Sequence, residues 1–260
     1  MEYLEIKGVA IKTLRIITIG FLLSIVFIPP LLAAPAFVDS QSFACTNSPC
    51  PANSYEFTYT GADEGGMLVL TLRSSAEDDY TVASSGETWV KDAEGVLLGW
   101  TFQVWRASNV AAGNHTITIT KDSGTTYYRV VVLEFSDMGE TPTVEDYSVN
   151  SYPTSNNSSV TTPDLTTTKD NTVLFCTVGS DSDNITWSAG TNFTLRNSCP
   201  TNGEPDQKLC TESREPVDAG TYSNGMTLDQ ANGNDSRISV FIAYAPSETP
   251  ANAIQGVTIN

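Results

Sequence analysis

The sequence predicts an all-β protein, a jelly-roll-like antiparallel β-sandwich of two sheets in one domain. Three observations predict it. Residues 127–137 (YYRVVVLEFSD) form a run of β-branched and aromatic side chains, which favour strands, with Glu134 the only acid inside the run. Residues 237–244 (RISVFIAY) repeat this character, and residues 115–120 (HTITIT) alternate with the period of a half-buried strand. No segment shows the period of an amphipathic helix.

Residues 1–36 are expected to be a signal peptide. A basic start precedes an apolar run at residues 16–28, which is too short to span a bilayer. Residues 34–36 (APA) match a cleavage pattern and place the mature start at Phe37, so secretion or display at the cell surface is expected. An uncleaved signal anchor is the alternative, and the prolines after the run disfavour it because proline interrupts helices.

The remaining chain is expected to hold one domain, since all-β domains reach roughly 200–250 residues. Residues 37–54 are a disulfide-containing lead-in, 55–246 the sandwich domain, and 247–260 a C-terminal tail or edge strand. The chain has 30 acidic and 13 basic residues, a net charge of −17. The negative charge of the chain repels nucleic acid and anionic membrane surfaces, so no nucleic-acid partner is expected. No membrane span is expected to remain after signal cleavage.

The five cysteines fit an oxidising compartment. Cys45 and Cys50 close a short loop, and Cys199 and Cys210 bracket a polar insert. Local bridges within each pair are therefore the simplest of the three connectivities that four cysteines allow. Cys176 lies in an apolar strand and is expected to be a free, buried thiol. The spacings do not match a zinc site, and the chain has a single histidine.

Alternating or continuously apolar segments, separated by Gly, Asn and Asp turns, place the strands. In chain order, strands are expected at residues 55–60, 67–73, 80–83, 88–90, 96–106, 115–120, 127–137, 158–162, 171–178, 185–188, 192–196, 237–244 and 254–259. Segment 67–73 (MLVLTLR) is apolar on both faces, which predicts a central strand covered on both sides.

The two halves of the chain can be laid over each other. Residues 68–79 match 173–184, and residues 129–136 match 237–244. The overlay gives the two strongest strands, residues 127–137 and 237–244, matching central positions in the two halves. It aligns Glu134 with an isoleucine of the second half. Few identities support it, so an internal repeat and a chance likeness of two strand patterns are both open.

A resemblance rests on the order of the patterns MLVLTLRSS, FQVWRASNVAAGNHTITIT and YYRVVVLEFSD, then NTVLFCTVGS, GTNFTL and SRISVFIAY. Over roughly residues 54–245 this order resembles a family of secreted and surface-associated bacterial and phage β-sandwich modules. In that family a VWxxxxxxAGxHTxTxT hairpin precedes a strand ending in an E-F-S-like turn. The resemblance implies a jelly-roll-like fold, mostly without an assigned activity, and the two cysteine pairs look like additions to it.

No catalytic site is predicted. A Ser-His-Asp site needs a histidine as its base, and the only one, His115, starts a threonine-rich strand, where a structural role is expected. Glycosidases use two carboxylates, but no partner acid lies at a matching spacing from Glu134. One of Arg73, Arg106 or Arg129 is expected to pair with Glu134 across strands instead.

Binding is the favoured activity. Trp89 and Trp187 lie in short polar strands, where an exposed ring could stack on a sugar; with Glu134 they are the candidate ligand-binding residues. The acidic loops carrying Asp78, Asp79, Asp181 and Asp183 offer oxygen ligands for a structural Ca²⁺, the one cofactor considered. Neither loop completes a known calcium motif.

The sequence therefore predicts a non-catalytic, secreted or cell-surface binding module, with glycan as the favoured ligand class. A structural or adhesive protein that binds other protein chains is the alternative partner hypothesis. A glycan-active hydrolase that uses Glu134 is the least favoured.

Overall fold

The computed structural model describes residues 33–45, 53–122, 127–155, 158–181, 186–197, 199, 208–229 and 235–247. The fold below is that of the compact unit Ala34–Asn260. The described residues form eighteen strands and contain no helix, and hence no helix that could cross a membrane. Most of the predicted signal peptide, Cys50, Asp183 and the predicted strand at 254–259 lie outside the described residues.

The strands are β1 (Ala36–Cys45), β2 (Ser54–Ala62), β3 (Met67–Ser74), β4 (Tyr80–Ser84), β5 (Trp89–Leu97), β6 (Trp100–Ser108), β7 (Gly113–Lys121), β8 (Tyr128–Ser136), β9 (Thr143–Ser155), β10 (Ser159–Val160), β11 (Leu165–Thr167), β12 (Thr172–Ser180), β13 (Trp187–Ser188), β14 (Thr194–Leu195), β15 (Lys208–Val217), β16 (Gly220–Tyr222), β17 (Met226–Leu228) and β18 (Asp235–Ala245).

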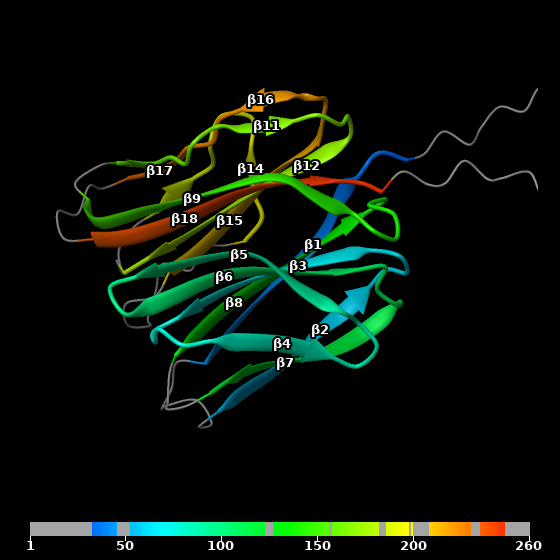
Figure 1. The fold of residues 1–260 in the computed structure, drawn as a ribbon, viewed down its shortest axis with the longest axis horizontal. Coiled ribbons are helices and arrows are strands. Elements are labelled where there is room, and N and C mark those ends of the chain that lie inside the picture. Colours follow the sequence, from blue (N-terminus) through cyan, green and yellow to red (C-terminus); the bar gives the residue numbers. More distant parts are fainter. Residues whose placement is uncertain are drawn as a thin grey trace, which may run out of the picture. The chain divides into compact units, whose positions relative to one another are not determined.

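These strands form antiparallel sheets in four layers (Figure 1). The first inner sheet has the order β1-β8-β3-β6-β5, and the second inner sheet has the order β14-β15-β12-β18-β9. The first outer sheet, β2-β7-β4, covers the first inner sheet. The second outer layer consists of β10-β17-β13 and the pair β11-β16. The all-β antiparallel sandwich is confirmed, but the expectation of two sheets was wrong, because each half of the chain supplies its own pair of layers.

Three hydrophobic cores separate the four layers. The middle core lies between the two inner sheets and includes Phe102 and Leu133 from the first half and Phe175 and Val240 from the second. The other two cores lie beneath the outer layers. Because both faces of each inner sheet are covered, β3, β12 and β18 are buried at every position. The outer strand β7 alternates instead, as its sequence predicts.

The two halves of the chain share one strand topology. Replacing β1, β8, β3, β6 and β5 by β9, β18, β12, β15 and β14 converts the order of the first inner sheet into that of the second. The outer sheet β2-β7-β4 likewise corresponds to β10-β17-β13, and the strands follow the same order along the chain. This agreement supports an internal repeat over a chance likeness. Strands β11 and β16 are additions of the second half.

The sequence overlay of the two halves needs a shift of one residue. Leu68 pairs with Glu134 in the first inner sheet, and Leu174 pairs with Ala243 in the second. Leu68 faces an outer core, as Leu174 does, whereas Val173 faces the middle core. A shift of one residue exchanges the two faces of a strand. The counterparts of Leu68 and Glu134 are therefore Leu174 and Ala243.

Several strands differ from the sequence prediction. The expected strand 96–106 is divided by a two-residue turn at Leu98 and Gly99, both with positive φ (49° and 85°), which suits a hairpin between β5 and β6. Part of the predicted lead-in is β1, an edge strand paired with β8. Strands β8 and β18 lie beside the central strands β3 and β12 rather than at the centre.

Polar side chains also join the two halves. Arg106 and Asp92, both in the first half, form an ion pair with 3.2 Å between Nε and Oδ2. The hydroxyl of Tyr244, on β18, donates to the same Asp92 oxygen at 3.0 Å. Arg106 therefore pairs with Asp92, and its expected contact with Glu134 is not formed.

At Gly95, β5 packs tightly against β18 and β9 of the second inner sheet. A β-carbon at this position would lie 2.3 Å from Cδ1 of Ile238 and 3.1 Å from Cγ1 of Val149. Gly95→Ala is therefore expected to lower the free energy of unfolding by about 1–3 kcal/mol through overpacking. Urea denaturation measures this loss of unfolding free energy. The control is Val96→Ala, at an exposed neighbouring position. Unchanged stability of Gly95→Ala would contradict this packing of the two halves.

Candidate functional site

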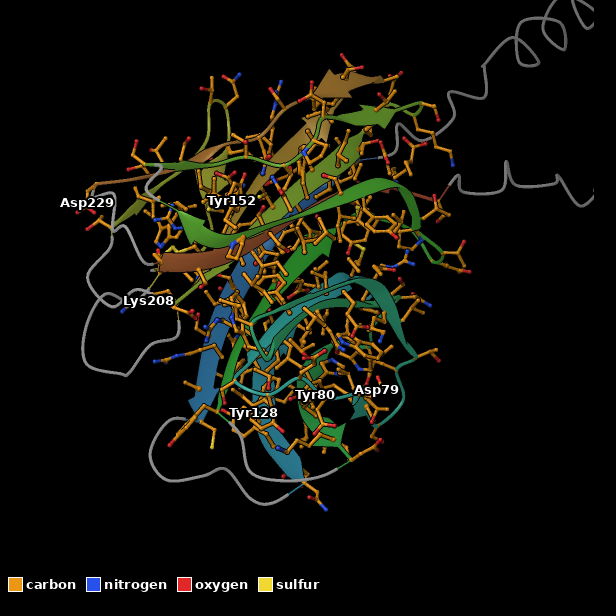
Figure 2. All side chains as sticks on the ribbon, turned by 60° about the vertical axis from the view of Figure 1, so that its left-hand side comes forward. Asp79, Tyr80, Tyr128, Tyr152, Lys208 and Asp229 are labelled. Carbon is orange, nitrogen blue, oxygen red and sulfur yellow. A yellow bond between two sulfur atoms is a disulfide. The ribbon has the colours of Figure 1, made fainter. Side chains whose placement is uncertain are left out.

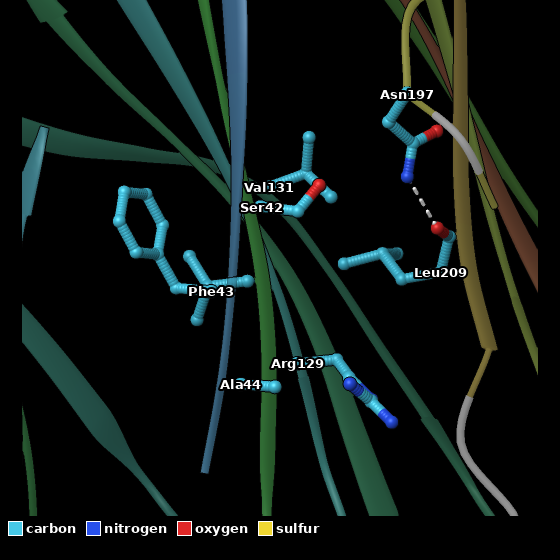
Figure 3. A pocket seen from close by; sticks show the side chains of 8 residues that line it. Ser42, Phe43, Ala44, Arg129, Val131, Asn197 and Leu209 are labelled. Atoms are coloured by element: carbon cyan, nitrogen blue, oxygen red, sulfur yellow. Dashed lines mark hydrogen bonds between the residues drawn. The ribbon is translucent and has the colours of Figure 1, made fainter. Parts of the chain in front are cut away.

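A groove of about 270 Å³ opens between the two inner sheets, where β1 and β8 face β15 (Figure 3). Val131 and Leu209 belong to the middle core and form its apolar floor. The described residues that line it are Ser42, Phe43, Ala44, Arg129, Val130, Val131, Asn197 and Leu209. The Phe43 ring points to the other side of β1, where it packs on Phe57 with 4.3 Å between ring centroids.

Asn197 forms the wall of the groove on the side of β15. Its Nδ2 donates to the carbonyl oxygen of Leu209 at 2.7 Å, and its Oδ1 accepts from the backbone N–H of Thr211 at 2.8 Å. The disulfide between Cys199 and Cys210, with 4.8 Å between the Cα atoms, ties the same segment to β15. This bridge confirms the predicted pair, and the wall of the groove is thereby held in place.

Arg129 is the one charged residue among the described residues that line the groove. It is half-buried, and its register partner in β3 is Arg73. Arg73 is 2% exposed, forms an ion pair with Asp181, and lies 4.3 Å from the ring centroid of Trp100. Burial lowers the pKa of Arg73 to about 10, and the neighbouring Asp181 carboxylate opposes this shift.

Trp89 and His115 belong to one chain of hydrogen bonds away from the groove. Trp89 is half-buried, and its Nε1 donates to Oγ of Ser84 at 2.8 Å; Ser84 in turn donates to Glu87 at 2.5 Å. Glu87 also contacts Nδ1 of His115 at 2.8 Å, and the other ring nitrogen lies 2.8 Å from the carbonyl oxygen of Ala111. Both ring nitrogens of the buried His115 are therefore engaged in contacts within the protein.

Trp187 is not available for stacking on a sugar. It is 4% exposed and belongs to the hydrophobic core beneath the second outer layer. The polar strand around it suggested exposure, but the tertiary fold covers this strand. Neither candidate tryptophan lines the groove.

Glu134 is a buried structural carboxylate. It is 0% exposed; its Oε2 accepts from the hydroxyl of Tyr59 at 2.9 Å and its Oε1 from the backbone N–H of Asp63 at 2.7 Å. Its partners are therefore not the three arginines named from the sequence. The register partner on β1 is Asp39, an acid from the predicted lead-in. Burial, and next the contact with Glu134, raise the pKa of Tyr59.

The candidate calcium ligands are not gathered into a site among the described residues. Asp181 pairs with Arg73, and Asp79 lies 3.7 Å from Lys91 at the surface. Figure 2 shows Asp79 beside Tyr80, in the first half of the chain. Within the described ranges, no three Asp, Glu, His or Cys side chains are placed to hold a metal. A structural Ca²⁺ stays a prediction.

The sequence did not reveal a second buried carboxylate, Glu212. Its Oε2 accepts from the backbone N–H of Gly190 at 2.7 Å, while Oε1 has no hydrogen-bond partner among the described residues. Burial raises the pKa of Glu212 to about 7. The sequence predicts no strand at residues 208–217, because this stretch has no apolar alternation, and therefore no pattern identifies Glu212 as a buried residue.

Cys176 is the register partner of Glu212 on β12 and is a free, buried thiol, as predicted. Nδ2 of Asn224 lies 2.5 Å from its sulfur. Burial, and next the charge of Glu212, raise the pKa of Cys176, so the thiol stays protonated. A buried thiol of this kind is not a nucleophile.

Compared with known proteins, the chain matches no protein-family model, no curated protein and no solved structure.

Tyr59→Phe is expected to lower the free energy of unfolding by about 1–3 kcal/mol, because it leaves an oxygen of buried Glu134 without its donor. Chemical denaturation measures the change. Tyr55→Phe is the matched control, since the Tyr55 ring packs on Phe57 and Tyr128 and no described residue accepts a hydrogen bond from its hydroxyl. Equal stability of the two variants would show that the Tyr59 contact is dispensable.

Glu212 makes stability depend on pH. Its pKa is higher in the folded state than its ordinary value of 4.5, so the folded state binds more protons than the unfolded state between about pH 4.5 and 7. The free energy of unfolding is expected to fall by about 3 kcal/mol as pH rises through this window.

Glu212→Gln removes this contribution, so the difference in unfolding free energy between variant and wild type should grow in the variant's favour from pH 4.5 to 7. The exposed Glu56→Gln is the control and should follow the wild type. A difference between Glu212→Gln and wild type that does not change with pH would contradict a buried, neutral Glu212.

Proposed function

We propose that the chain is a non-catalytic, secreted or cell-surface module that binds a glycan in the groove between its two halves. The observation that carries the proposal is the groove itself, which combines an apolar floor of Val131 and Leu209 with the polar groups of Ser42, Arg129 and Asn197. Small-ligand sites have this composition, an apolar lining with a few placed polar groups.

The size and shape of the groove favour part of a larger ligand. Its volume of about 270 Å³ is just below the roughly 300–1,000 Å³ of sites that enclose drug-sized molecules. The groove is also partly open to solvent, so it does not enclose its ligand completely. An oligosaccharide with one unit seated in the groove satisfies both conditions, since sugars present apolar C–H faces and polar edges.

The placement of the ionisable groups supports binding without catalysis. Glu134 is fully buried and accepts a hydrogen bond from the Tyr59 hydroxyl. The ring nitrogens of His115 contact Glu87 and the carbonyl oxygen of Ala111. Neither residue lines the groove. General acid–base catalysis requires a titratable group within hydrogen-bond reach of the reacting atoms.

A glycan array on the purified protein tests the proposal, followed by titration calorimetry with the retained glycans. Ser42→Trp places a large ring in the groove from an exposed strand position, and it is expected to weaken binding at least tenfold. Thr81→Trp, exposed on the first outer sheet, is the control and should bind as the wild type does. Full binding by Ser42→Trp would place the site elsewhere, and an array without retained glycan would refute the proposal.

A further inference from the structure

We propose that the groove binds the acetamido group of an N-acetylated amino sugar, in the space that corresponds to the one where the first half of the chain holds its own backbone at Gly95. This inference rests on the proposed glycan-binding function and names the class of sugar. It is carried by the topology that the two halves share, which relates the groove at one edge of the middle core to the packing around Gly95 at the other edge.

Three residues surround Gly95 and define what we call the Gly95 site. Phe102 is its register partner on β6. Ile238 and Val149 of the second half lie so close that a β-carbon at Gly95 would be 2.3 and 3.1 Å from their side chains. A side chain at this position would overlap with Ile238, so the space holds peptide backbone alone.

The first of these residues corresponds to the apolar floor of the groove. Phe102 pairs with Arg73, and Leu209 pairs with Gly179. These two partners occupy equivalent positions of the central strands β3 and β12, so Leu209 is the counterpart of Phe102. Both belong to the middle core.

The other two residues of the Gly95 site correspond to groove residues in the same way. Ile238 on β18 and Arg129 on β8 pair with the same two central positions. Val149 on β9 and Ser42 on β1 are equivalent by their register with β18 and β8. All three counterparts, Leu209, Arg129 and Ser42, line the groove. The groove is therefore the second half's version of the Gly95 site.

The two sites differ because β14 is shorter than β5. Strand β5 runs along β6 to Leu97, whereas β14 ends at Leu195. The backbone N–H of Arg196 still donates to the carbonyl oxygen of Thr211 at 2.9 Å. Asn197, the next residue, bonds β15 through its side-chain amide. Where the first half has a peptide group beside the inner sheet, the second half has a side chain and the groove.

An acetamido group is the sugar substituent that most resembles peptide backbone, since it has an amide N–H, a carbonyl oxygen and a methyl group. Val131 and Leu209 offer an apolar surface for the methyl group. The Ser42 hydroxyl can accept from the amide N–H, and Nδ2 of Asn197 has a second hydrogen besides the one donated to Leu209. Figure 3 shows Asn197 and Leu209 on one side of the groove and Ser42 on the other.

Titration calorimetry with three oligosaccharides of equal length and linkage tests the inference. They differ only at the second carbon of each unit, which carries an acetamido group, a hydroxyl or a free amino group. We expect the acetamido oligosaccharide to bind about tenfold or more tightly than the hydroxyl one, the effect of one or two added hydrogen bonds. The amino oligosaccharide is a cation that the acidic protein attracts, so equal or tighter binding of it would assign the preference to charge and overturn the inference.

Ser42→Val introduces the residue that Val149 supplies in the Gly95 site. It should weaken binding of the acetamido oligosaccharide at least tenfold, because the larger side chain fills part of the groove, and valine suits a strand. Thr81→Val, at an exposed position of β4, is the matched control and should bind as the wild type does.

Two results would overturn the inference while the proposed function stands on the glycans that the array retains. One is equal binding of the hydroxyl and acetamido oligosaccharides, and the other is full affinity for the acetamido oligosaccharide in Ser42→Val. An array that retains no glycan would overturn both the inference and the proposed function.

Discussion

The middle hydrophobic core is the constraint on which the rest of the structure depends. Each half of the chain supplies a five-stranded sheet whose inner face is apolar, with Phe102 and Leu133 on one side and Phe175 and Val240 on the other. Either half alone would expose this face to water at a cost of about 25 cal/mol for each Å² of apolar surface. The two halves therefore stabilise each other, and the groove lies where this core reaches the edge of the sheets.

The two halves share a topology but differ in where they hold buried carboxyl groups. Glu134 of the first half corresponds to Ala243 of the second, by the register of the two inner sheets. Glu212 of the second half corresponds to Trp105 of the first, since their register partners Cys176 and Leu70 are equivalent. Each half thus holds a buried carboxylate where the other holds an uncharged residue. The shared feature is the backbone arrangement, and the groove is made from residues of both halves.

The success of the sequence prediction followed the strength of each local pattern. Strands β3, β7, β8, β12 and β18 were predicted nearly to their ends, because continuous or alternating apolar residues mark a covered strand. Strand β9 was missed in a Ser-, Thr- and Asn-rich stretch, since an edge strand needs few apolar side chains. Strand β15 was missed because its buried residues include Lys208, Glu212 and Ser213, which have no apolar period.

The sequence by itself determined the all-β class, because this class follows from residue type and local alternation. It favoured the free Cys176 and the local Cys199–Cys210 bridge, which the structure confirms. Only the tertiary structure decided the four layers, the burial of Trp187 and the partners of Glu134. It also assembled the groove, whose described lining residues come from separate parts of the chain, around Ser42 and Arg129 and at Asn197 and Leu209. Their proximity follows from strand order and register, which no local pattern encodes.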